Sequence, residues 1–508
     1  MNLLSSTAIF SFFTLISRIL GYLRDILIAI FLGASILADV FFVAFRLPNT
    51  FRRLFAEGTF NAAFIPSYTK ERLTSDRAGK MFADDVLRLV TISLLFLVLL
   101  VEIFTPIVIF LIAPGFFQDS IKYDLVIELA RITFPFLLFV SVSSLFSGVL
   151  NSHNKFAAAA AAPIILNVVL IVILLVSYFF NTNFVKNLSY GVTGAGILQM
   201  LFLMYFAKKF YKPSFEFKTK VNKKVKFFIK KLIPSIFSSG VTQINILVGT
   251  IIASFQAGAV SYLYYADRVY QINLAIAGIA VSIVSLPALS RAIKKKNKKN
   301  IFQIQNKSIE LTFLLSIPAS IGLIIASEEI VSSLFGYGSF SEEDVKLTSK
   351  ALLYFGYGVP AFALVKVLGN LFFARDDTKT PLKISLLIVA LNILISVFFF
   401  SKIGFIIIPI ATTTSSWIGI IIYFFILNEK KFLNIERELF KNLAKIFLCS
   451  FLMSLLLIYG IGFFSDELMY SNTFKFLYLL FIVTFVAIIY LISCNLLGLL
   501  KFKNYKTI

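Results

Sequence analysis

Apolar stretches of roughly 18–25 residues recur from one end of this chain to the other, and each is long enough to cross about 30 Å of hydrocarbon as a helix. Of the 508 residues, 59% are hydrophobic and only 15% are charged, whereas soluble domains carry roughly 25% charged residues. A transmembrane β-barrel would need short strands of alternating hydrophobicity, which the sequence lacks. We therefore expect an all-α polytopic membrane protein.

Charge runs, Pro/Gly clusters and apolar length predict about fourteen membrane-spanning helices. The predicted spans are 6–33, 36–65, 83–112, 123–150, 157–180, 189–208, 227–255, 259–290, 305–327, 346–373, 380–400, 403–427, 442–464 and 475–500. They divide the chain into an N-terminal lobe (1–208), a basic linker (209–226), a C-terminal lobe (227–427) and a final part with two additional spans and a tail (428–508).

An internal repeat supports this division. A shift of about 225 residues places Pro135 on Pro360 and Asn167 on Asn392, and a slightly smaller shift places IPSYTK on LPALSR. Each copy contains six predicted spans, so the two copies have the same orientation in the membrane. Parallel repeats of this kind are typical of alternating-access transporters with a central site. The last two spans have no counterpart in the repeat.

Lysine and arginine concentrate in alternate loops, which indicates topology. The basic segments are Lys70–Lys80, Lys208–Lys231, Arg291–Lys299, Arg375–Lys383, Lys430–Lys445 and the tail from Lys501. The positive-inside rule then places both termini in the cytoplasm. The net charge of +22 is explained by these loops beside anionic membrane lipids, so no nucleic-acid partner is predicted.

The first two predicted spans carry an unusual amount of charge. Five basic and three acidic residues lie there: Arg18, Arg24, Asp25, Asp39, Arg46, Arg52, Arg53 and Glu57. A guanidinium at mid-bilayer costs roughly 2.5–3.5 kcal/mol, so such residues normally face a wet cavity on a transport pathway. The surplus of arginine predicts an anionic cargo. A diphosphate suits it, because the guanidinium fork binds phosphate oxygens in pairs.

The eighth predicted span adds a shorter polar stripe with Asp267 and Arg268, and the tenth adds Lys366. A structural alternative is that these charges only brace the helices, with Arg18 paired to Asp25 and Asp267 paired to a neighbouring arginine. Three acids in the first two spans cannot neutralise five bases, and this favours the binding interpretation.

The sequence has no signature of an enzyme. Its only histidine, His153, lies in a short predicted turn, and there is no nucleotide-binding loop, metal-ligand cluster or Ser/His/Asp arrangement. We therefore predict neither catalysis nor a cofactor. Without a nucleotide-binding domain, transport would use an ion gradient, the membrane potential or a downhill gradient.

Several strings resemble the MurJ (MviN) family of lipid II flippases, within the multidrug/oligosaccharidyl-lipid/polysaccharide exporter superfamily. They are NLLSSTAIFSFFTLISRILGYLRDILIA, ADVFFVAFRLPNTFRRLFAEGTFNAAFIP, YYADRVYQ and FFARDDTKTPLK. The resemblance implies two six-helix lobes around a central cavity, plus two extra helices. It also implies that lipid II, a peptidoglycan precursor linked to undecaprenyl diphosphate, moves from the cytoplasmic to the periplasmic leaflet of the bacterial inner membrane.

The same resemblance implies the site residues. The cavity arginines of the family correspond to Arg18, Arg24, Arg52 and Arg268, and the accompanying acids correspond to Asp25, Asp39 and Asp267. Our hypothesis is that Arg24, Arg52 and Arg268 grip the diphosphate. Arg18 would then hold the first two helices in register together with Asp25 and Asp39.

Some family members bind sodium through an acid on the seventh helix. The comparable region here offers only Gln243 and Asn245, so no metal ligand is assigned.

Three alternatives remain open at this stage. An O-antigen or capsule-unit flippase would also handle diphosphate-linked lipids. A cation-coupled multidrug exporter would favour an acidic cavity, which the surplus of arginine opposes. A scaffold of the cell-wall synthesis proteins, which are possible partners of a flippase, would not need charged stripes inside the membrane.

Overall fold

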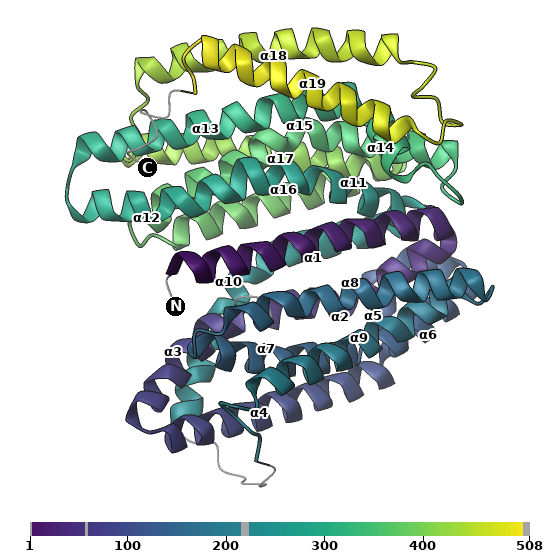
Figure 1. The fold of residues 1–508 in the computed structure, drawn as a ribbon, viewed down its shortest axis with the longest axis vertical. Helices are drawn as coiled ribbons and strands as arrows, with labels where there is room; N and C mark the ends of the chain where they lie inside the picture. The colour runs from purple at the N-terminus through teal and green to yellow at the C-terminus, as the bar shows by residue number, and fades with distance from the viewer. Residues whose placement is uncertain (1–2, 56–58, 215–222, 501–508) are drawn as a thin grey trace. The chain divides into compact units, whose positions relative to one another are not determined.

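The computed structural model describes residues 3–55, 59–214 and 223–500, and every regular element in these ranges is a helix (Figure 1). The chain divides into two compact units, Met1–Ser261 and Tyr262–Ile508.

The first unit contains α1 (Leu3–Leu32), α2 (Ile36–Phe55), α3 (Thr59–Thr74), α4 (Asp76–Ile103), α5 (Thr105–Ile112), the 3-10 turn η1 (Pro114–Gln118), α6 (Ser120–Thr133), α7 (Phe136–Ser152), α8 (Phe156–Phe179), α9 (Phe184–Ala207) and α10 (Lys223–Ala253).

Helix α11 (Ala259–Leu274) starts in the first unit and runs into the second. It is followed by the π-helical turn η2 (Ala275–Ala280), α12 (Val281–Lys294), α13 (Lys298–Ile325), α14 (Ser327–Phe335), α15 (Glu342–Phe373), α16 (Lys379–Ile403), the 3-10 turn η3 (Gly404–Ile406), α17 (Ile407–Glu429), α18 (Arg437–Phe463) and α19 (Lys475–Leu496).

Ten stretches of the described chain are long and apolar enough to cross a membrane, and one of them, Lys379–Glu429, contains both α16 and α17. Three of the fourteen predicted spans, 6–33, 36–65 and 227–255, are not among the ten, although α1, α2 and α10 are helical there. In α2, the 20 residues include four charges, which lower its mean hydropathy. The polytopic all-α fold is nevertheless as predicted.

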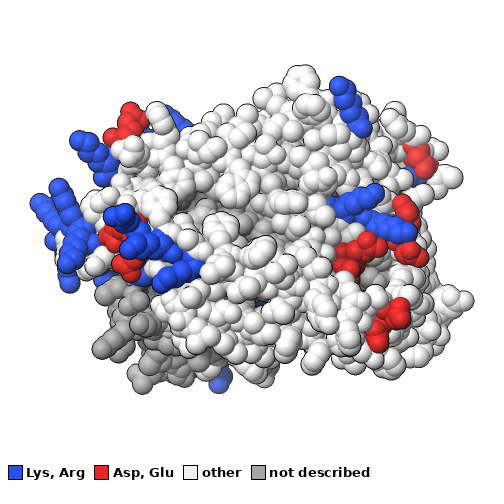
Figure 2. All heavy atoms as spheres, turned by 90° about the horizontal axis from the view of Figure 1, so that it is seen from above, with Lys and Arg blue, Asp and Glu red and all other residues white. Residues whose placement is uncertain are grey.

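The surface of the molecule agrees with this assignment. In the face shown in Figure 2, Lys, Arg, Asp and Glu gather at two opposite ends, and the broad middle is uncharged. Basic side chains dominate one of the ends. An uncharged belt between polar ends is what a bilayer requires of a spanning protein.

Two predicted spans are interrupted at prolines. The span 83–112 divides where α4 ends at Ile103 and α5 begins with Pro106 in its first turn. The span 123–150 divides between α6 and α7, at Phe134 and Pro135. Proline has no backbone N–H and its ring clashes with the preceding turn, so an apolar run through it continues only with a break or bend.

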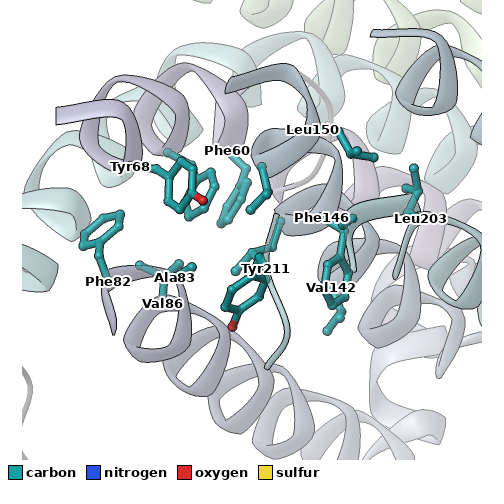
Figure 3. Packing of buried hydrophobic residues seen from close by; sticks show 14 of the residues in the cluster. Phe60, Tyr68, Phe82, Ala83, Val86, Val142, Phe146, Leu150, Leu203 and Tyr211 are labelled. Atoms are coloured by element: carbon teal, nitrogen blue, oxygen red, sulfur yellow. The ribbon is translucent and has the colours of Figure 1, made fainter. Parts of the chain in front are cut away.

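A cluster of buried hydrophobic residues, many of them aromatic, comes from α3, α4, α7, α9 and the start of α10 and forms a core of the first unit. Figure 3 shows part of this cluster. Phe64 is fully buried and stacks on Phe60 and Tyr68 with ring centroids 5.2 and 5.4 Å apart. Phe228 at the start of α10 packs edge-on against Phe60 at 5.7 Å. Because Phe228 belongs to this cluster, α10 folds with the first unit, and that unit extends beyond the lobe boundary expected at 208.

In the second unit, polar side chains on α13 hold the segment that leads into α18. The Gln305 amide donates to the Phe432 carbonyl at 2.7 Å, and the Asn306 amide donates to the Asn434 carbonyl at 2.8 Å. Further along α13, the Glu310 carboxylate accepts from the Asn442 amide at 3.0 Å. The two additional C-terminal helices are therefore attached to α13 by hydrogen bonds as well as by apolar packing.

Replacing Phe64 by Ala should destabilise the first unit strongly. The fully buried ring contacts four other aromatic rings, and truncating a core Phe costs about 3–5 kcal/mol. Thermal unfolding of the detergent-solubilised protein would measure the loss. The control is Phe451→Ala on α18, where the ring is exposed; equal melting temperatures for the two variants would contradict the assignment of this core.

The turn before α16 is held by Asp377, which accepts from the backbone N–H of Thr380 at 3.0 Å and from the Lys430 ammonium at 2.9 Å. The Thr380 backbone bond, together with Lys430, lowers the pKa of Asp377 to about 2. Since this pKa is depressed on folding, the stabilisation is present above the ordinary pKa near 3.8 and disappears as the pH falls towards 2.

Asp377→Asn should therefore lower the melting temperature at pH 7, and the difference from the original protein should shrink as the pH falls from 4 towards 2. Asp376→Asn is the matched control, because asparagine also tolerates the left-handed backbone at this position (φ 59°). A difference that stayed constant with pH would show that the Asp377 carboxylate is not the stabilising group.

Candidate functional site

Arg24 is buried at the contact between α1 and α8, with 6% of its surface exposed. Its Nε and Nη2 both donate to Oδ1 of Asp25, at 3.0 and 2.6 Å. Its Nη1 donates to Oδ1 of Asn167 on α8 at 3.0 Å. One carboxylate and one carboxamide therefore hold two edges of the same guanidinium.

The close packing of α1 on α8 makes this arrangement possible. Gly21 faces Asn167, and a methyl group on Gly21 would lie 3.5 Å from the Asn167 amide nitrogen. The same amide donates to the Ser17 carbonyl at 2.9 Å. Asn167 thus links the backbone of α1 to the side chain of Arg24, a role that the sequence analysis missed because it noted Asn167 only as a landmark of the repeat.

The other two predicted arginines of the first unit lie in more open surroundings. Arg18 is exposed, and among the described residues no bond joins it to Asp25, so the expected pair is not formed. Arg52 is half-buried, and its Nε donates to Oδ1 of Asn49 at 3.0 Å. Glu57 lies outside the described residues.

Asp39 is fully buried in the first turn of α2 and accepts several hydrogen bonds. The Lys122 ammonium donates to Oδ2 at 3.2 Å, and the backbone N–H of Gly258 donates to the same oxygen at 2.9 Å. The backbone N–H and hydroxyl of Ser261 donate to Oδ1 at 2.9 and 2.7 Å. Asp39 therefore connects α2 to α6 and to the N-terminal end of α11, and no bond from Asp39 to α1 is among the described contacts.

Lys122 is a residue that the sequence analysis assigned only to a loop. Asp119 caps α6 by accepting from the backbone N–H groups of Ile121 and Lys122, and this places Lys122 in the first turn. The ammonium group is buried, 3.8 Å from the centroid of the Phe116 ring. The position of Lys122 in the sequence gave one indication of a special role. It is one of the few basic residues in the loops that alternate with the strongly basic loops.

The same end of the first unit is packed tightly through glycine. The Gly115 backbone N–H donates to the Ser254 hydroxyl at 3.0 Å. A methyl group on Gly115 would lie 2.3 Å from the Ser254 carbonyl oxygen, which is too close for any side chain. The turn η1 and the end of α10 therefore lie in direct backbone contact beside the Asp39 bonds.

In the second unit, the stripe of α11 forms bonds within its own helix. Arg268 donates from Nη2 to the Tyr264 hydroxyl at 2.8 Å, and its guanidinium lies 4.8 Å from the centroid of the Tyr264 ring. Asp267 accepts from the Gln271 amide, and the expected pair between Asp267 and a neighbouring arginine is not among the described contacts. Lys366 on α15 is exposed.

The described residues contain no group of three or more His, Cys, Asp or Glu side chains able to hold a metal ion. The groups that the first unit does bring together are guanidinium, carboxylate and carboxamide. This set can bind an anion or exchange one anion for another, and it offers no nucleophile with an adjacent base.

Asp39→Asn should destabilise the protein by about 3–5 kcal/mol, because it leaves the buried Lys122 ammonium without its counter-ion. The double variant Asp39→Asn with Lys122→Met should regain part of this loss, since it removes the uncompensated charge. Thermal unfolding of the three proteins in detergent measures the coupling. No recovery in the double variant would count against the ion pair as the source of the effect.

Comparison with known proteins gives one consistent result. The family described as "Lipid II flippase MurJ" matches residues 28–480. A relative named probable lipid II flippase MurJ, from Rickettsia prowazekii (strain Madrid E), is 36% identical over 461 residues and covers 90% of both chains. Another of that name, from Buchnera aphidicola subsp. Schizaphis graminum (strain Sg), is 32% identical over 516 residues and covers 99% of this chain and 98% of its own.

Solved structures agree. A lipid II flippase MurJ in an inward closed conformation matches with a TM-score of 0.81 and 27% identity, and covers 96% of this chain and 98% of that chain. An inward-facing multidrug resistance transporter of the MATE family matches with a TM-score of 0.68 and 15% identity over 82% of this chain and 94% of that chain, which shows a shared fold alone. This chain therefore belongs to the lipid II flippase MurJ family, whose members are multi-pass transporters of the bacterial inner membrane and not enzymes.

Proposed function

We propose that this protein carries lipid II from the cytoplasmic to the periplasmic leaflet by alternating access, with its arginines holding the diphosphate. The family match over residues 28–480 supports the substrate. The observation that carries the mechanism is Arg24, a guanidinium buried in a helix that has the length to cross the bilayer. Burying such a charge is costly, and function is the usual reason that it is retained.

The contacts of Arg24 explain how it would bind a diphosphate. A guanidinium recognises carboxylate and phosphate oxygens with the same planar fork of N–H groups. The Asp25 carboxylate lies against the Nε and Nη2 edge, 2.6 Å from Nη2. In the proposed loading step, phosphate oxygens replace this carboxylate. Arg18 and Arg52 in the same unit and Arg268 in the second unit supply the further positive charge that a diphosphate requires.

Asp39 and Lys122 have a different role in the proposal. Four hydrogen bonds hold Asp39 to α6 and to the N-terminal end of α11. This network closes the end of the first unit at which α2 begins. If the basic loops lie in the cytoplasm, as the positive-inside rule predicts for both termini, this closed end faces the periplasm and the network breaks when the carrier opens outward.

The membrane potential would favour the proposed direction. Moving a charge across the membrane is worth about 2.3 kcal/mol per 100 mV, so an anionic diphosphate leaves an inside-negative cell downhill. The long polyprenyl tail must stay in hydrocarbon. The outer faces of α18 and α19 expose apolar side chains such as Phe451 and Phe481, and we assign the tail to these helices.

The diphosphate assignment predicts that Arg24→Ala and Arg52→Ala each abolish complementation of a flippase-depleted strain at normal membrane abundance. Each change removes a guanidinium from the proposed binding set. Arg77→Ala is the control, because Arg77 is exposed near the start of α4, within a basic loop. Normal growth with both test variants would refute the assigned role.

The transport activity itself is tested in reconstituted vesicles. Labelled lipid II should become accessible on the opposite face when the original protein is present, and not in empty vesicles or with Arg24→Ala. Transfer of a capsule or O-antigen lipid, or of a cationic drug, without transfer of lipid II would instead support one of the rival functions of the superfamily.

A further inference from the structure

Asn167 contacts the guanidinium that the proposed function depends on. It lies on α8 with 7% of its surface exposed. Its Oδ1 accepts from Nη1 of Arg24 at 3.0 Å, and its Nδ2 donates to the Ser17 carbonyl at 2.9 Å. Both ends of the carboxamide are thus used, and the amide cannot flip without losing both bonds.

The repeat supplies a natural comparison. Asn392 occupies the position on α16 that corresponds to Asn167, and it is equally buried, with 5% exposed. Its amide donates to the Thr412 hydroxyl at 3.3 Å, and its Oδ1 accepts from Ser396 at 3.2 Å. A buried asparagine can therefore serve at this repeat position by bonding to hydroxyl groups, whereas Asn167 in the first copy bonds to an arginine.

We propose that Asn167 is a positioning residue of the diphosphate site, which holds the Arg24 guanidinium by one edge and directs its other edge towards the phosphate. This inference rests on the proposed function. Asp25 occupies the Nε and Nη2 edge, and Asn167 occupies Nη1. When phosphate oxygens replace the Asp25 carboxylate, the bond to Asn167 keeps the plane of the guanidinium in place.

Asn167 is uncharged, and this affects how an anion would bind beside it. An aspartate at this position could accept the same bond from Arg24, but it would add a second negative charge beside the guanidinium. That charge would repel the diphosphate and compete with it. A carboxamide orients the arginine and leaves its positive charge available to the ligand.

The experiment compares Asn167→Leu and Asn167→Asp in reconstituted vesicles, with the concentration of lipid II varied. Loss of a hydrogen bond to a charged group should raise the half-saturating concentration about tenfold or more in N167L, with a smaller change in maximal rate. N167D should raise it further, because of the added negative charge. Aspartate has nearly the shape of asparagine, so N167D remains informative if N167L does not fold.

Asn392→Leu and Asn392→Asp are the matched controls. They should lower the melting temperature in detergent and leave the half-saturating concentration of lipid II unchanged. If Asn167 has a purely structural role, N167L and N167D should also lower the melting temperature and leave the half-saturating concentration of lipid II unchanged. The two variants would then not differ in that concentration. That result would overturn the inference.

Arg24→Ala separates the two proposals. If R24A abolishes transport while the Asn167 variants keep the original half-saturating concentration, the diphosphate assignment stands and the positioning role falls. If R24A transports lipid II normally, the assignment of Arg24 to the diphosphate falls, and the positioning role falls with it.

Discussion

A charged side chain inside a membrane must find its partners within the protein, since the surrounding hydrocarbon offers none. This requirement organises the first unit. The Arg24 guanidinium takes a carboxylate from its own helix and a carboxamide from α8, which brings α1 and α8 together at Gly21. The Asp39 carboxylate contacts the lysine Lys122 of α6 and backbone N–H groups at the N-terminal end of α11. Two helix pairs of this unit, α1 with α8 and α2 with α6, are thus joined at the points where buried charges find their partners.

Arg24 and Asp39 are both buried, but they are bonded to different kinds of partner. Asp39 is bonded to backbone groups and to Lys122, so it is fixed for as long as these elements stay together. Arg24 is bonded to side chains, and one of these, Asp25, has the same charge as the proposed ligand. A phosphate can replace a carboxylate against a guanidinium, because both accept the same charge-assisted N–H hydrogen bonds. A carrier needs both kinds of site, one that exchanges its anion and one that keeps a gate closed.

The sequence was sufficient to predict the helical fold. The length of each apolar stretch must match the thickness of the bilayer, and the charge of the loops sets the orientation, so both can be found locally in the sequence. It was insufficient for the partners of the charges. Arg24 and Asn167 are 143 residues apart, and Asp39 and Lys122 are 83 residues apart, so no helical spacing connects them. The packing of α10 is not evident from the sequence for a similar reason, since only the fold shows that Phe228 joins the cluster around Phe64. The resemblance to the family identified the charged residues, but their pairing required the fold.

The lysine that the sequence analysis placed in a loop changes the charge balance of the site. Counted from the first two predicted spans alone, three acids offset five bases. Asp39 is neutralised by Lys122, which belongs to neither helix, so it does not offset the arginines at all. Arg24 contacts the Asp25 carboxylate and the neutral carboxamide of Asn167. The surplus of basic over acidic side chains is therefore larger by one than the sequence count suggested. In the proposed loading step, an anion that displaces Asp25 therefore meets a guanidinium that Asn167 already orients.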